Sequence, residues 1–201
     1  FHRDIFYAAN VFFDGDVKRI RLSLQEEMCL NMMGSVRIIG VCIETRPDAI
    51  TDEWVRFFRE SGTTRIQLGV QHTDNKILKK INRGHTFEQS YQATNFLRNN
   101  GFKIDIHAMP DLPGASPDID KKMFDTLLNS VIIQPDQIKI YPCEVVPFTV
   151  LEKWFKAGRF TPYTDKNSRD LIDVIKYAME ICPPWVRFPR IVRDIPLEYI
   201  K

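Results

Sequence analysis

Charged side chains gather at the carboxyl end of the first long apolar run of this sequence. Glu44, Arg46 and Asp48 follow or end the run 36–43, which is typical of a buried strand, and Pro47 restricts the backbone between them. Burying such groups is costly unless they are paired, so the stretch predicts a polar ligand or a salt-bridge network. Parallel α/β folds collect their ligands at this end of their strands.

Similar groups follow three further predicted strands. They are Gln71 and His72 after 65–70, His107 and Asp111 in or after 102–109, and Lys139, Tyr141 and Glu144 in or after 137–143. Taken singly, each has a structural interpretation: a surface position for His72, a helix cap for Asp48, an outward-facing Lys139. As a set they predict one site, where carboxylates would bind an ammonium or ribose hydroxyls and Arg46 would bind a carboxylate through two hydrogen bonds.

Two basic clusters lie outside this set. One comprises Lys76, Lys79, Lys80, Arg83 and His85, and the other comprises Arg187, Arg190 and Arg193 with Trp185 and Phe188 between them. Basic residues interleaved with aromatic ones suit phosphate contact and base stacking in RNA. The alternatives are a solvated helix face for the lysines and an ion pair with Asp194 for Arg193.

Composition narrows the class of protein. The net charge of +2 favours no particular partner, and the 44% hydrophobic content is that of a globular protein. No apolar run has membrane-spanning length and no targeting segment is recognisable. The four cysteines lack zinc or iron–sulfur spacing, which predicts reduced thiols in an intracellular protein and no metal ligands in this chain. Spacing leaves open that Cys143 and Cys182 meet in space.

The elements that must position these residues alternate between strands and helices. Helices are expected after Thr51, Thr73, Thr86, Ser116 and Thr149, with a last one near 170–181. A final strand is expected at 186–192, and Pro189 restricts it to the edge of the sheet or to an irregular segment. The first 33 residues predict two helices, and Ser23 and Glu26 form a capping box on the second. The order predicts an α/β fold: a partial or complete (β/α) barrel with parallel strands and outer helices, or alternatively an open doubly wound sheet.

Seven short motifs then occur in a recognisable order. They are IETRPD (43–48), GVQ (69–71), NRGH (82–85), HAMPDLP (107–113), KIYP (139–142), GRFTPY (158–163) and RDIP (193–196). As a set they resemble the family of Elongator catalytic subunits, which are radical S-adenosylmethionine (SAM) proteins acting on the tRNA wobble uridine.

The resemblance implies a function and assigns the residues. The family is a radical SAM barrel followed by an acetyltransferase domain, and uses SAM, a [4Fe–4S] cluster and acetyl-CoA to build a carboxymethyl-type group on C5 of the uridine. The implied SAM-pocket residues are Glu44, Arg46, Gln71, His107, Asp111, Lys139 and Tyr141. The implied tRNA contacts are Lys79, Lys80, Arg83, His85, Arg187, Arg190 and Arg193. Other Elongator subunits are implied partners, DNA and membranes are not, and the location would be cytoplasmic, or also nuclear in a eukaryote.

The chain also departs from the family pattern. The family's cluster cysteines and its glycine-rich SAM motif belong upstream of residue 1, and its acetyltransferase domain belongs beyond residue 201. Residues 1–182 are therefore expected to be the later part of the barrel and 183–201 a segment leading toward the acetyltransferase, in a chain that is inactive by itself. The alternatives are another radical SAM enzyme, such as one acting on a porphyrin precursor, and a non-catalytic RNA-binding or assembly module.

Overall fold

A computed structural model describes residues 1–15 and 18–192 of the chain. Its centre is a parallel sheet with the strand order β1-β2-β3-β4-β5. The strands are β1 (Val41–Thr45), β2 (Thr63–Gln71), β3 (Lys103–Ala108), β4 (Gln137–Ile140) and β5 (Arg187–Arg190). Arg193 lies outside the described residues, so its predicted RNA contact stays a prediction.

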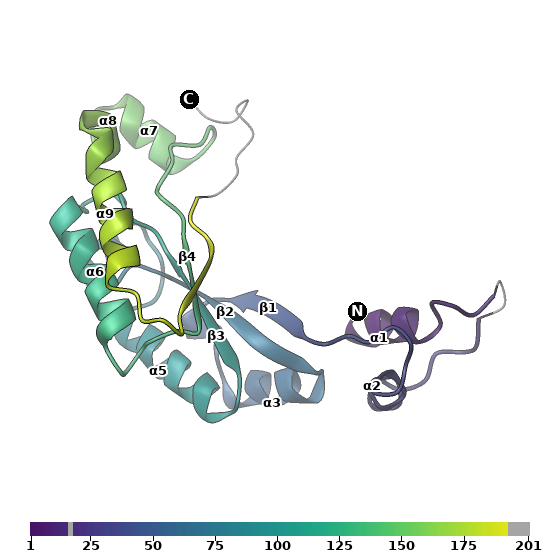
Figure 1. Ribbon diagram of the computed structural model, residues 1–201. Coiled ribbons are helices and arrows are strands. Elements are labelled where there is room, and N and C mark those ends of the chain that lie inside the picture. The colour runs from purple at the N-terminus through teal and green to yellow at the C-terminus, as the bar shows by residue number, and fades with distance from the viewer. Residues whose placement is uncertain (16–17, 193–201) are drawn as a thin grey trace.

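Helices cover one face of this sheet (Figure 1). The covering layer consists of α3 (Asp52–Glu60), α5 (Phe87–Asn99), α6 (Pro117–Asn129) and α9 (Ser168–Glu180). Each strand pairs with its neighbour in sequence, and right-handed crossovers in one direction place these four helices on the same side. That is the arrangement of a barrel sector, whereas a doubly wound sheet reverses its strand order and carries helices on both faces. The predicted partial barrel is therefore confirmed.

The two faces of the sheet differ in chemistry because successive side chains of a strand point to opposite sides. Ile66, Leu68 and Val70 of β2 join Ile104 and Ile106 of β3 in a buried cluster with the four covering helices. The residues between them, including Gln67, Asp105, His107 and Lys139, occupy the other face, which corresponds to a barrel interior. Helix packing thus stabilises the fold while the inner face stays polar.

Helix caps predicted from sequence are largely confirmed. Thr51 accepts a hydrogen bond from the backbone N–H of Trp54, Ser116 caps α6, and Thr86 forms a capping box with Gln89. The predicted cap at Thr73 is wrong, because Asp74 caps α4 (Asn75–Lys80). Thr149 caps α7 (Val150–Lys156), as predicted. The sequence did not predict the short helix α8 (Tyr163–Lys166) or a 3₁₀ turn at Pro47–Ala49. Strand β5 contains Pro189, as expected.

The first strand is shorter than predicted. It begins at Val41 instead of near residue 36, because the side chain of Asn31 binds the backbone groups that a strand would pair. Asn31 Nδ2 donates to the Val36 carbonyl at 2.9 Å, and its Oδ1 accepts from Ile38 N–H at 2.8 Å. The last long strand is also shorter, since β4 ends at Ile140.

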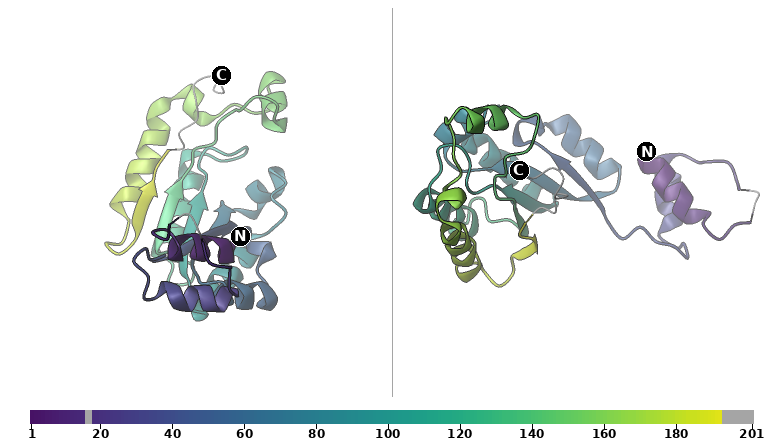
Figure 2. Two further views of the ribbon diagram at one scale, coloured as in Figure 1. Left: turned by 90° about the vertical axis from the view of Figure 1, so that its right-hand side faces the viewer. Right: turned by 90° about the horizontal axis from the view of Figure 1, so that it is seen from above.

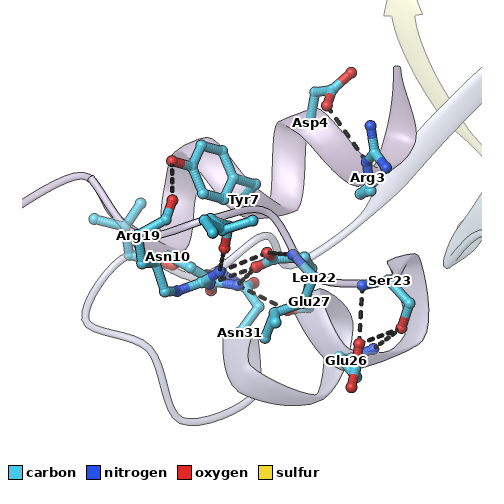
Figure 3. Close-up of polar contacts among 12 residues, drawn as sticks. Arg3, Asp4, Tyr7, Asn10, Arg19, Leu22, Ser23, Glu26, Glu27 and Asn31 are labelled. Carbon is cyan, nitrogen blue, oxygen red and sulfur yellow. Dashed lines mark hydrogen bonds and ion pairs between the residues drawn. The ribbon is translucent and has the colours of Figure 1, made fainter. Parts of the chain in front are cut away.

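The N-terminal helices α1 (His2–Asn10) and α2 (Leu24–Asn31) form a small lobe to one side of the sheet (Figures 1 and 2). His2 and Gln25 hydrogen-bond to backbone carbonyls at the carboxyl end of α3. Figure 3 shows the polar centre of the lobe, where Glu27 is fully buried. Arg19 donates to both carboxylate oxygens of Glu27 at 2.7 and 2.6 Å. These donors hold the pKa of Glu27 down to about 2.

No helix in the part of the chain that the structure describes combines the length and apolar character needed to cross a bilayer.

The Glu27 contacts predict an acid-sensitive N-terminal lobe. Because the folded pKa of Glu27 lies below its ordinary value of 4.5, its stabilisation is complete above that pH and is lost as the pH falls toward about 2. Glu27→Gln should lower amide-exchange protection in α1 and α2 by roughly ten- to a hundredfold at neutral pH, since hydrogen bonds to charged groups contribute about 1.5–3 kcal/mol. Hydrogen exchange followed by mass spectrometry, corrected for intrinsic rates, measures both effects.

Glu26→Gln is the matched control for this change, because Gln preserves the capping box with Ser23 on the same helix. Equal loss of protection in the two variants would contradict a special role for Glu27.

Candidate functional site

A cavity of about 370 Å³ opens at the carboxyl edge of the sheet and is called the mouth cavity below. Its lining draws on the ends of all five strands: Glu44, Gln71, His107, Met109, Tyr141, Pro142, Glu144, Val146 and Arg190. Four of the seven residues proposed for the pocket from sequence, Glu44, Gln71, His107 and Tyr141, therefore line one space. Arg190, expected to contact RNA, lines it too.

His107 is the best-defined group of this cavity. The amide oxygen of Gln67 accepts a hydrogen bond from Lys139 Nζ, and His107 Nε2 lies 2.9 Å from the same oxygen. Nε2 therefore carries a hydrogen. Nδ1 lies 3.4 Å from Glu44 Oε1. Burial lowers the pKa of His107 although Glu44 opposes the shift, so Nδ1 is a lone-pair acceptor at neutral pH. Two acceptors that face one another favour a ligand that supplies a donor.

The hydrogen bond to Gln67 also fixes the position of the Lys139 side chain. Its side chain is half-buried on the inner face and reaches Gln67, so the outward orientation considered from sequence is wrong. It lies directly beside His107 in the sheet, because the two residues are partners in the β3–β4 pairing. Lys139 and His107 both contact the amide oxygen of Gln67, and Lys139 is not part of the lining of the mouth cavity.

Gln71 ends β2 with a left-handed backbone, at a φ of 70°. Its carbonyl accepts from Met109 N–H at 2.7 Å, which ties β2 to the end of β3. The side-chain Oε1 is buried and has no hydrogen-bond partner among the described residues. A buried carbonyl without a partner is costly, and a donor from a ligand in the mouth cavity would satisfy it.

The guanidinium of Arg83 packs against Gly69. Arg83 Nη2 donates to the Gly69 carbonyl at 2.8 Å, and a Cβ added at Gly69 would lie only 2.4 Å from that nitrogen. The space that Gly69 leaves is thus filled by a side chain of the protein. Burial lowers the pKa of Arg83 without discharging a group of this basicity. Arg83 therefore lies half-buried beside the sheet edge instead of on a solvated helix face.

Arg46 and His85 belong to a network around Asp48. Arg46 binds both carboxylate oxygens of Asp48, which holds the pKa of Asp48 below its usual value. His85 is buried, with Nδ1 3.9 Å from Asp48 and Nε2 3.4 Å from the Val70 carbonyl. The salt-bridge network predicted for this stretch is present. The helix cap predicted for Asp48 is not, because Thr51 caps α3.

Asp111 lies away from the mouth cavity. Its carboxylate accepts from Tyr163 N–H at 2.8 Å, from Thr164 N–H at 3.1 Å and from the Thr164 hydroxyl. It is buried, and burial raises its pKa despite these donors. The sequence placed Asp111 in the pocket by its distance from a strand, whereas the structure places it in a link between the β3–α6 loop and α8.

His72 continues this link and is fully buried, so its predicted surface position is wrong. Its Nδ1 accepts from Asp74 N–H at 2.9 Å, and its Nε2–H therefore donates to Asp120, 3.1 Å away. Asp120 also accepts from Asp111 N–H and Tyr163 O–H, each at 2.8 Å. Sequence reasoning missed Asp120 and Tyr163. The available signal was Asp120, the second acidic residue in the first turn of α6, but a local pattern attributes such a charge to stabilisation of the helix terminus.

The remaining basic candidates are exposed. Lys79 and Lys80 end α4, and Arg187 and Arg190 lie on β5, the edge strand beside the mouth cavity. Cys143 and Cys182 pack with different hydrophobic clusters and are free thiols. Burial raises the pKa of Cys143 to about 12, so this thiol is not a ready metal ligand. Among residues 1–15 and 18–192, no three His, Cys, Asp or Glu side chains are grouped to hold a metal ion.

Comparison with protein families supplies the wider context. The model of the radical SAM superfamily matches residues 5–127, and that of the Radical_SAM C-terminal domain matches residues 135–200. The chain belongs to the radical SAM superfamily.

Individual proteins are similar to this chain in sequence and in structure. The tRNA uridine(34) acetyltransferase of Methanocaldococcus infernus is 42% identical over 178 residues, which cover 89% of this chain and 33% of that protein. Elongator complex protein 3 of Bos taurus is 33% identical over 82% of this chain and 30% of its own. The solved structure of archaeal Methanocaldococcus infernus Elp3 with an N-terminal deletion (1–46) has a TM-score of 0.89 and 39% identity, over 99% of this chain and 44% of its own. This radical SAM chain thus spans about a third of the length of the curated relatives it matches.

The buried link predicts a large loss of stability on removing the Asp120 charge. Asp120→Asn replaces an acceptor of three hydrogen bonds by a group that is half donor, so we expect about 3 kcal/mol less unfolding free energy in urea titrations. Tyr163→Phe removes one of the three donors and should cost clearly less. A loss for Asp120→Asn no larger than that for Tyr163→Phe would contradict the central place of Asp120.

Proposed function

We propose that this chain forms the SAM-binding part of an enzyme that modifies the wobble uridine of tRNA. The observation that carries the proposal is the pair of polar atoms in the mouth cavity, Glu44 Oε1 and His107 Nδ1, which lie 3.4 Å apart. Its support is the superfamily match together with the identity to tRNA uridine(34) acetyltransferases.

The residues of the mouth cavity fit SAM. SAM carries an ammonium, two ribose hydroxyls and a positively charged sulfonium, which match the acceptors on Glu44, His107 and Gln71. Tyr141 packs edge-on against His107 with ring centroids 5.3 Å apart and offers an aromatic surface to the adenine. When bound, SAM supplies one-electron chemistry.

The described residues do not fit a [4Fe–4S] cluster. Such a cluster is held by cysteine thiolates, and the described part of the chain offers no group of suitable side chains. What the residues of this chain do is bind and orient: His107 is held by Gln67, Glu44 is placed opposite its free nitrogen, and Arg83 closes the space beside Gly69. The cluster, like acetyl-CoA and the carboxymethyl-type product on C5, enters the proposal through the family resemblance alone.

Partners and domains follow the same resemblance. We infer tRNA as the substrate and other Elongator subunits as possible partners, because relatives carry the names tRNA uridine(34) acetyltransferase and Elongator complex protein 3. Residues 183–201 are proposed to lead toward an acetyltransferase domain, and Arg187–Arg190 within them forms β5 of this sheet. A cytoplasmic location, or a nuclear one in a eukaryote, is proposed from the free thiols.

The rival functions differ in what the mouth cavity must do. A non-catalytic RNA-binding module has no use for a carboxylate and a buried imidazole paired in a cavity at the strand ends, so this pair favours an enzyme. A radical SAM enzyme acting on a porphyrin precursor would share the SAM site but not an affinity for tRNA. Binding of the two ligands, measured separately, therefore distinguishes all three possibilities.

The acceptor pair predicts that Glu44→Gln weakens SAM binding. The substitution keeps the size of a side chain that is 64% exposed but removes the charge that attracts the sulfonium and ammonium. We expect roughly tenfold lower affinity, in line with one charged hydrogen bond. Equilibrium dialysis with labelled SAM, on the protein that carries this chain, measures it.

Glu53→Gln, at an exposed position of the outer helix α3, is the control for the loss of one negative charge. Affinity unchanged in Glu44→Gln, or lowered equally in both variants, would remove Glu44 from the SAM site.

The exposed basic residues predict salt-dependent tRNA binding. Lys79→Ala/Lys80→Ala and Arg187→Ala/Arg190→Ala should each flatten the slope of log affinity against log salt, by roughly 0.7–0.9 for every phosphate that the variant no longer neutralises. The reduction in affinity should be similar for different tRNA sequences because phosphates carry no sequence information. Filter binding at several salt concentrations gives the slopes.

The control for these double variants is Lys122→Ala/Lys176→Ala, which removes two charges from the outer helices α6 and α9. Slopes that stay at the wild-type value in both test variants would assign the four residues to a solvated surface.

A further inference from the structure

A second cavity, of about 560 Å³, lies between the end of α4 and helix α7. Its lining includes Leu151 and Trp154 of α7, together with Lys80 and Arg83 at and after the end of α4. The cavity shares Gln71, Met109 and Glu144 with the mouth cavity, so the two spaces adjoin across the end of β2. The SAM site proposed above makes no use of the wall formed by α7.

Trp154 is held in place before any ligand arrives. It is half-buried and packs against a small hydrophobic cluster whose buried members are Ile77, Leu112, Cys143 and Phe160. Its carbonyl accepts from Arg159 N–H at 2.8 Å, which closes the end of α7. An aromatic wall of fixed orientation binds a flat ligand without the entropic cost of ordering a mobile side chain.

Arg83 supplies a polar group to the same cavity. Its Nη2 donates to the Gly69 carbonyl, and its buried Nε–H has no hydrogen-bond partner among the described residues. A planar ligand with an acceptor on its edge would satisfy this second donor. A purely apolar ligand, such as an acyl chain, would leave it unpaired at a cost.

Basic residues line the cavity and flank it along the chain. Lys80 and Arg83 belong to its lining together with the acidic Glu144. Lys79 precedes Lys80 at the exposed end of α4, and Lys153 is exposed on α7, whereas Lys156 forms an ion pair with Glu152 at 2.8 Å. A flat polar-edged ligand carried on a polyanion matches an aromatic cavity with cations in and beside its lining.

We propose that this cavity takes a nucleobase flipped out of a single-stranded loop of the RNA substrate. The base would stack on Trp154, its edge would accept from Arg83 Nε–H, and its flanking phosphates would lie near Lys79 and Lys80. The inference rests on the proposed RNA-modifying function and adds to it a base subsite. Since the cavity adjoins the mouth cavity through Gln71, the flipped base is brought next to the bound SAM.

The test pairs a protein change with an RNA change. Trp154→Ala should weaken binding of an anticodon stem-loop RNA roughly tenfold, the usual effect of removing one aromatic ring on which a base stacks, and should leave the salt slope unchanged. Abasic substitutions at successive positions of the loop should include one that weakens wild-type binding equally. For that RNA, Trp154→Ala should have no additional effect.

Two control variants keep the result interpretable. Phe155→Ala removes the neighbouring aromatic ring on α7, which is 39% exposed and does not line the cavity, and it should bind normally. Trp154→Phe retains an aromatic surface and should restore most of the affinity if Trp154→Ala disturbs the fold of α7.

The outcomes separate this proposal from the one before it. Additive losses from Trp154→Ala and every abasic RNA, with wild-type binding intact, would overturn the base subsite and leave the tRNA function standing. A wild-type protein that binds SAM but not the stem-loop would overturn the tRNA function itself. Equal losses in Trp154→Ala and Phe155→Ala would also overturn the subsite.

Discussion

Parallel pairing of each strand with its neighbour in sequence is the constraint from which the rest of this structure follows. It places the four covering helices on one face, where Leu68, Ile106 and their neighbours are buried against them and satisfy the hydrophobic driving force. The other face is left free to carry polar side chains that a two-sided core would not tolerate. It also aligns all strand ends at one edge, which is why Glu44, His107 and Arg190 meet although up to 146 positions separate them in sequence.

A few shared acceptors organise the polar groups around the site. One amide oxygen, on Gln67, accepts from both His107 and Lys139, and one carboxylate, on Asp120, accepts from three donors. The Gln67 oxygen orients His107 in the mouth cavity. The Asp120 carboxylate holds His72, the β3–α6 loop and α8 together. Because such low-dielectric networks are costly when only partly satisfied, they favour a single arrangement of the site.

Local signals in the sequence predicted most of the framework. Caps at Thr51, Thr86 and Ser116, together with apolar strands, were enough to give the element order and the barrel sector. They failed where a partner distant in sequence decides. Asp111 binds backbone 52 positions away and His72 binds a carboxylate 48 positions away, so neither role is visible in a local pattern. Arg83 resembled its lysine neighbours in charge and differs only because Gly69 leaves room for it.

The fit between Gly69 and Arg83 has a consequence for how this protein can drift in sequence. A methyl group at position 69 would lie 2.4 Å from Arg83 Nη2, so the guanidinium, which is the free end of a flexible side chain, would have to move away and lose its hydrogen bond to the Gly69 carbonyl. A lineage can therefore enlarge residue 69 at the cost of that one bond, and the released cation would then be available to other partners. The two positions, 14 apart and on different elements, are coupled through this hydrogen bond, so a substitution at one is expected to change which residues are tolerated at the other.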